Sequence, residues 1–182
     1  MYNLYLNHSL TIDPGDHTGW AYWIGDSCPI VGQYNVSVKK DMILTEDDLA
    51  FLMRKFSELL DRWDACTRVY IEGVELWEGS LRSMTSAKRG NVFKLAYLVG
   101  GYFNEARRQG IETRILPARQ WKGQMPNAVL EQRVLRLNGQ HYPSDHILNA
   151  VGIGFSRAGL LTQVRGRVVA STQAKQRGHQ WN

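Results

Sequence analysis

The chain has 182 residues, which corresponds to about one domain with room for a full hydrophobic core. Hydrophobic residues make up 43% of it and charged residues 21%, and these ordinary fractions exclude wholesale disorder. No apolar run approaches the roughly 20 residues of a membrane-spanning helix, and the opening MYNLYLNHSLT lacks the features of a secretion signal. Cys28 and Cys66 are too few for a disulfide framework or a zinc site, so we expect a protein of the reducing cytoplasm.

The net charge of +5 is unevenly distributed along the chain. Residues 1–81 carry 6 Lys and Arg against 13 Asp and Glu, whereas residues 82–122 carry 9 against 2 and residues 162–182 carry 4 against none. A charged, solvated surface would account for this pattern. Clustered cations also fit a phosphate backbone, because a polyanion binds several Lys and Arg side chains together. Carboxylates beside such a surface are typical of a metal-dependent nuclease.

Three strands are expected first. Residues 8–13 end at the turn signal DPG, and residues 19–24 and 29–38 flank a second turn at residues 25–27. Short connections of this kind join antiparallel neighbours, so the three strands are predicted to form a meander.

A helix is expected over residues 46–64, where apolar side chains recur every three or four positions, and Thr45 with Asp48 predicts its cap. A short strand follows at residues 68–72. A long helix is then expected over residues 84–109, terminated by a glycine.

The remaining chain continues the alternation with a strand at 111–116 and helices at 127–137 and 145–161, the last rich in small residues that predict close packing. This order predicts an α/β fold with a mixed five-stranded sheet, its first three strands antiparallel, flanked by helices on both faces. We expect a single domain over residues 1–161 and a basic, flexible tail at 162–182, where periodicity vanishes.

Two acidic residues, Asp13 and Glu72, each end an apolar strand. An acid before Pro-Gly can be only a turn former, but two acids at strand ends are harder to explain in that way. If the first and fourth strands are adjacent and parallel, the two carboxylates lie close together, and keeping both ionised needs a cation between them. Oxygen ligands favour Mg²⁺ or Mn²⁺.

The last helix offers a third ligand from Asp145, His146 or Asn149, because residues three or four apart share a helix face. Two divalent ions about 4 Å apart would then activate a water and stabilise the leaving oxygen of a phosphodiester.

Five segments stand out as a set: Ser9–Trp20 (SLTIDPGDHTGW), Val69–Val74 (VYIEGV), Lys94–Gly101 (KLAYLVGG), Pro117–Lys122 (PARQWK) and Ser144–Gly154 (SDHILNAVGIG). In this order and spacing they resemble the RuvC-type Holliday junction resolvases, which belong to the ribonuclease H-like nucleases. The resemblance covers residues 8–161, nearly the whole expected domain. The short chain and its unusual loops suggest a phage version, which would act in the host cytoplasm.

The resemblance implies a ribonuclease H-like fold and a homodimer that binds a four-way DNA junction and nicks two strands symmetrically, in DNA recombination and repair. It implies phosphodiester hydrolysis with two Mg²⁺ or Mn²⁺ ions per site, and neither a membrane nor a small-molecule cofactor. The catalytic residues carried over are Asp13, Glu72, Lys122, Asp145, His146 and Asn149, of which Asp13, Glu72, His146 and Asn149 are the metal ligands.

Residues 75–89 combine cations with an aromatic ring, a composition that suits phosphate contacts and stacking on an unpaired base. Trp77 would fit a core position equally well. Lys122 is expected to hold the scissile phosphate or to neutralise transition-state charge. The helix at 84–109 is the expected dimer surface, unless its apolar stripe belongs entirely to the core. The predicted DNA-binding residues are Trp77, Arg82, Lys88, Arg89, Lys94, Arg119 and Lys122.

One departure from the family concerns Asn149, which stands where the family has its final aspartate. Three interpretations stay open: an engineered inactive Asp-to-Asn variant, a natural variant in which Asp145 takes over, or a register that is one turn off. The alternative functions are another ribonuclease H-like nuclease, acting on flaps, forks or RNA–DNA hybrids, and a junction-binding protein without cleavage activity.

Overall fold

The computed structural model describes residues 7–25, 28–36, 44–75 and 90–161. The expected tail at 162–182 lies outside these ranges, as do four of the predicted DNA-binding residues, Trp77, Arg82, Lys88 and Arg89. Within the described ranges, no helix is both long and apolar enough to cross a membrane.

A five-stranded sheet in the order β3-β2-β1-β4-β5 forms the centre of the fold. Strands β1, β2 and β3 pair antiparallel as a meander, whereas β4 and β5 run parallel to β1. The predicted mixed five-stranded sheet is therefore confirmed. The strands are β1 Ser9–Asp13, β2 His17–Trp23, β3 Ile30–Asn35, β4 Arg68–Gly73 and β5 Glu112–Pro117.

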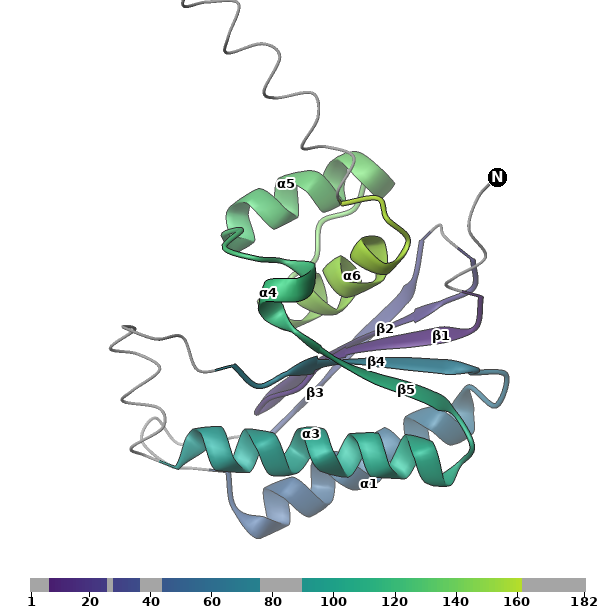
Figure 1. The fold of residues 1–182 in the computed structure, drawn as a ribbon, viewed down its shortest axis with the longest axis vertical. Coiled ribbons are helices and arrows are strands. Elements are labelled where there is room, and N and C mark those ends of the chain that lie inside the picture. Colours follow the sequence, from purple (N-terminus) through teal and green to yellow (C-terminus); the bar gives the residue numbers. More distant parts are fainter. Residues whose placement is uncertain (1–6, 26–27, 37–43, 76–89, 162–182) are drawn as a thin grey trace, which may run out of the picture.

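Helices cover both faces of the sheet, as predicted (Figure 1). The two longest helices, α1 (Glu46–Arg62) and α3 (Asn91–Arg108), lie on one face. On the other face, α6 (Asp145–Arg157) packs against β1 and β2, with α4 (Ala118–Trp121) and α5 (Asn127–Asn138) beside it.

Two predicted helix boundaries differ from the structure or lie beyond what it describes. The described helix α3 begins at Asn91, after a left-handed Gly90 at its N-cap, with φ 77°, and residues 84–89 of the predicted helix lie outside the described residues. The last helix ends at Arg157 rather than at residue 161, and a second left-handed glycine, Gly159, follows it. The four-residue helix α4 was not predicted, since one turn is too short to show a hydrophobic period.

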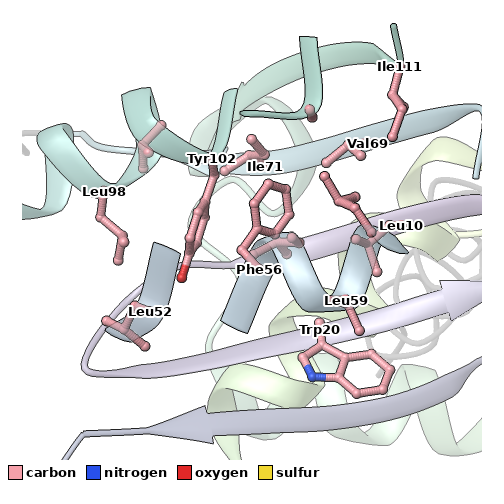
Figure 2. Close-up of a cluster of buried hydrophobic side chains, with 14 of the residues drawn as sticks. Leu10, Trp20, Leu52, Phe56, Leu59, Val69, Ile71, Leu98, Tyr102 and Ile111 are labelled. Atoms are coloured by element: carbon pink, nitrogen blue, oxygen red, sulfur yellow. The ribbon is translucent and has the colours of Figure 1, made fainter. Parts of the chain in front are cut away.

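The core between the sheet and the helix pair α1 and α3 is built from aliphatic and aromatic side chains (Figure 2). The rings of Phe56 on α1 and Tyr102 on α3 lie 4.4 Å apart, centroid to centroid. The Tyr102 hydroxyl reaches 3.2 Å to the Thr18 hydroxyl, which also donates to the carbonyl of Gly15. The long helix is thereby tied to the turn that follows β1.

The core on the opposite face depends on how closely α6 approaches the sheet. A Cβ atom at Gly154 would lie 2.1 Å from the Trp23 ring, so only glycine fits at this position. Beside it, the buried hydroxyl of Thr11 on β1 donates to the Ala150 carbonyl of α6, at 2.7 Å, and accepts from the Trp23 indole. The expected close packing of the small residues of α6 is confirmed.

Candidate active site

The carboxyl-terminal ends of β1 and β4 bring Asp13 and Glu72 together. These strands pair parallel with Ile12 opposite Ile71, so the next residue on each strand carries its carboxylate to the same edge of the sheet. This arrangement confirms the prediction that the first and fourth strands are adjacent and parallel. Asp13 is buried, with 7% of its surface exposed.

The environment of Glu72 favours the protonated acid. Burial, the charge of Asp13 and a hydrogen bond between the two carboxyl groups together raise the pKa of Glu72 to about 9, and burial has the largest effect. Its Oε2 atom is buried and finds no hydrogen-bond partner among the described residues. A buried, unpartnered carboxylate oxygen beside a second carboxylate is the environment that a bound cation would satisfy.

The first two turns of α6 add two side chains to this pair. His146 Nδ1 lies 2.9 Å from Asp13 Oδ2, and Asn149 Nδ2 donates to the same oxygen at 3.1 Å. The hydrogen bond with Asp13 raises the pKa of His146. Because an ionised carboxylate only accepts, Nδ1 carries the proton in this pair. Asp145, the first residue of α6, is exposed to solvent.

Gly19 on β2 permits this approach of α6. A Cβ atom at Gly19 would lie 2.3 Å from both the carbonyl carbon and the carbonyl oxygen of His146. Because these are backbone atoms, no side-chain rotation relieves the contact. Gly15, in the turn after Asp13, lies more loosely against the His146 ring, since a Cβ atom there would lie 3.3 Å from the side-chain atom Cε1.

We expect Gly19→Ala to destabilise the fold by about 1–3 kcal/mol, because the added methyl group forces α6 away from the sheet. Gly100→Ala is the matched control: apart from its chain neighbours and the nearby backbone of α3, no atom of the described residues lies within 4 Å of its Cβ position, and alanine in a helix interior is favoured over glycine by about 0.5–1 kcal/mol. Urea unfolding of both variants measures the difference. Equal stability of Gly19→Ala and the unaltered chain would contradict the close approach.

Lys122 reaches the same constellation from the end of α4. Its ammonium donates to Asn149 Oδ1 at 3.0 Å and to Asn127 Oδ1 at the start of α5. Burial lowers the pKa of Lys122, while the nearby carboxylates of Glu72 and Asp13 oppose that shift. The structure thus joins five of the six predicted catalytic residues in one network, in which Asp145 contributes only its charge.

Two residues beside the site were not predicted from the sequence. Asn127 was missed because an asparagine next to a proline signals only a helix start. His17 follows the first turn and its ring centroid lies 6.0 Å from that of His146, while its Nδ1 lies 3.0 Å from Asn35 Oδ1. An exposed histidine at the first position of a strand carries no periodic signal, so only the folded structure identifies it.

The two further described residues predicted to bind DNA are both engaged elsewhere in the fold. The Arg119 guanidinium pairs with the Glu75 carboxylate at 2.8 Å, and the same carboxylate accepts the backbone N–H of Arg119. Lys94, on α3, donates to the carbonyl of Leu44 ahead of α1, on the face of the sheet opposite to α6.

The donor set at the site fits a hard divalent cation. Within the described ranges, no group of three or more His, Cys, Asp or Glu side chains is arranged to hold a metal ion. The pair Asp13 and Glu72 nevertheless supplies carboxylate oxygens, one of them buried without a partner. Oxygen donors of this kind suit Mg²⁺ or Mn²⁺, which are commonly held by one or two carboxylates together with substrate phosphates.

The sheet order and the flanking helices define a ribonuclease H-like fold of the RuvC type. The structure of Thermus thermophilus RuvC in complex with a Holliday junction substrate aligns with a TM-score of 0.60 and 14% sequence identity, covering 85% of this chain and 94% of that one. A second Thermus thermophilus RuvC structure aligns with a TM-score of 0.55 and 15% identity, covering 86% and 96%. No family model matches the chain, and no curated protein sequence matches it.

Proposed function

We propose that this protein is a metal-dependent endonuclease that resolves branched DNA, with four-way junctions as its principal substrate. The observation that carries the proposal is the pairing of Asp13 and Glu72 at the ends of two parallel strands, with the Lys122 ammonium in the same network. The RuvC-like fold supports the same activity, since one of its structural neighbours is RuvC bound to a Holliday junction substrate.

The residues of the site would have different roles in phosphodiester hydrolysis. Asp13 and Glu72 would hold the divalent cation, which supplies activation of water and stabilisation of the leaving oxygen. Lys122 lies at the end of α4, where its ammonium donates to Asn127 of α5 and to Asn149 of α6. From there it would neutralise charge on the scissile phosphate. His146 holds Asp13 in its orientation through the hydrogen bond to Oδ2. The sequence-based assignments of Asp145, His146 and Asn149 to catalysis or metal binding stay predictions.

A homodimer formed through α3 is part of the proposal. One face of this helix is buried on the sheet, whereas Phe93 and Tyr97 on another face are 75% and 66% exposed. A four-way junction has two strands to cut in symmetry-related positions, which calls for two active sites related by a two-fold axis. An apolar helix face repeated on a second copy of the chain would supply that symmetric interface.

Tyr97→Glu is expected to shift the protein from dimer to monomer, because it places a charge in the centre of the proposed interface. Val129→Glu is the matched control, since Val129 is an exposed apolar residue on α5, across the sheet from α3. Light scattering over a concentration series measures the mass of each variant. A monomeric unaltered chain, or a dimer that both variants retain, would contradict the α3 interface.

The function is tested by nicking assays with Mg²⁺ on a synthetic four-way junction, a replication fork and an RNA–DNA hybrid of matched length. Paired, symmetric nicks in the junction are expected, with little cleavage of the other two substrates. Preferential cleavage of the fork or of the hybrid would contradict the proposed junction specificity and would indicate another ribonuclease H-like nuclease.

The same assay with Asn149→Asp addresses the second candidate, a junction-binding protein without cleavage activity, which the amide at position 149 favours. If only the Asn149→Asp variant nicks the junction, the unaltered chain is an inactive variant of a resolvase. If neither chain nicks but both bind the junction, the binding-protein function replaces the proposal. The viral origin expected from the sequence stays a prediction.

A further inference from the structure

The amide of Asn149 lies between a carboxylate and an ammonium group. Its Nδ2 donates to Asp13 Oδ2 at 3.1 Å, and its Oδ1 accepts from Lys122 Nζ at 3.0 Å. Only one orientation of the amide satisfies both neighbours, because the reversed amide would set oxygen against the carboxylate and NH₂ against the ammonium. The oxygen that would serve a metal ion is therefore already directed at a cation of the protein itself.

Lys122 is fixed at this position by contacts from two other elements. Its ammonium also donates to Asn127 Oδ1 on α5, and the side chain is partly buried. The charges of Asp13 and Asp145 attract it, as does that of Glu72 when this carboxyl group is ionised. A lysine held in this way presents its ammonium to the carboxylates from one fixed position.

The carboxylates supply protein ligands for one divalent ion. His146 and Asn149 both donate to Oδ2 of Asp13, and the buried Oε2 of Glu72 has no partner among the described residues. Two carboxylates are a common protein share of the ligands of a single Mg²⁺ ion, which completes its shell with water and phosphate. A second divalent ion would have to approach the Lys122 ammonium, and the repulsion grows with the product of the two charges.

We infer that this site holds one divalent cation, on Asp13 and Glu72, and that the Lys122 ammonium, seated by Asn149, takes the place of a second one. The catalytic role of this arrangement rests on the proposed nuclease function. One divalent ion per site is inferred here, in place of the two ions expected from the sequence. In this arrangement Asn149 is a working part of the site, because an aspartate there would pair with Lys122 and repel Asp13 unless another cation were bound.

The experiment counts bound Mn²⁺ by titrating the intact chain and following the electron paramagnetic resonance signal of free Mn²⁺, without any DNA. We expect one tight site per chain in the unaltered protein and none in Asp13→Asn. Asn149→Asp is expected to add a second Mn²⁺. Asn127→Asp is the matched control, because it makes the same charge change on the other side of Lys122 without contacting Asp13, and it should leave the count at one.

Two Mn²⁺ ions or none in the unaltered chain would overturn the inference. It would equally be overturned if Asn149→Asp added no ion, or if Asn127→Asp added one as well. Circular dichroism of each variant establishes that the counted chains are folded. The nicking assays separate this result from the proposed function. One bound Mn²⁺ without cleavage of DNA would contradict the proposed nuclease function but not the single-ion site. Two bound Mn²⁺ ions with cleavage would contradict the single-ion site but not the nuclease function.

Discussion

Asp13→Asn is expected to abolish nicking of a four-way junction while leaving junction binding unchanged. The substitution removes a carboxylate that would bind the cation directly, and the loss should exceed the roughly 10- to 100-fold cost of removing an outer partner of a metal site. Binding should persist, because the substitution leaves unchanged the basic side chains that are proposed to contact the phosphate backbone. Single-turnover cleavage and gel-shift affinity, both measured with Mg²⁺, give the two quantities.

The matched control for this prediction is Asp16→Asn, three residues further along the same turn. Asp16 accepts the backbone N–H of His17 and makes none of the hydrogen bonds that join Asp13 to α6, although its charge, like that of Asp13, raises the pKa of His146. It removes the same unit of negative charge, so an effect of net charge alone would appear in both variants. Equal loss of cleavage in both variants, or loss of binding together with cleavage in Asp13→Asn, would defeat the assignment of Asp13 as a cation ligand.

Glu72→Gln is expected to stabilise the metal-free protein at neutral pH by about 1–3 kcal/mol, although it should inactivate the site. The pKa of Glu72 is raised by burial and by Asp13 to about 9 in the folded protein. The unfolded chain releases the proton near the ordinary pKa of a glutamate, about 4.3. The stabilising effect of the bound proton is therefore complete below about pH 4 and is lost progressively as the pH rises toward 9. Glutamine stays neutral and avoids that loss.

Urea unfolding between pH 5 and pH 9, in the presence of a chelator, tests this expectation. The stability of the unaltered chain should fall with rising pH more steeply than that of Glu72→Gln. Glu58→Gln is the control, because Glu58 forms an exposed pair with Lys55 on α1 and should change stability little. A Glu72→Gln variant that is less stable than the unaltered chain at pH 7 and above would contradict the environment described for Glu72.

Added Mg²⁺ should reverse the order of the two proteins. A cation that binds only the folded state stabilises it in proportion to the logarithm of its concentration relative to its dissociation constant. The unaltered chain offers both carboxylates and should gain stability, whereas Glu72→Gln has lost one ligand and should gain much less. Equal gains would indicate that Mg²⁺ binds elsewhere on the chain.

Much of the fold could be predicted because the relevant signals are local. Alternation and turn residues indicated the three-stranded meander, and the apolar period of residues 46–64 indicated α1 together with its cap at Thr45 and Asp48. The errors lie at boundaries, where backbone conformation decides. The last helix ends at Arg157, ahead of the left-handed Gly159, although its apolar residues continue to residue 161, and the single turn of α4 is too short to carry a pattern.

The sequence by itself determined which side chains are available for chemistry: two acids at strand ends, a helix that opens with Asp145 and His146, and a lysine after an aromatic residue. Only the tertiary structure decided their partners. Parallel pairing of β1 with β4 joined Asp13 to Glu72, and the glycine contacts of β2 and α6 set Asn149 between Asp13 and Lys122. Residues 136 positions apart meet through these packed surfaces, and that contact depends on the summed burial of both cores rather than on any local pattern.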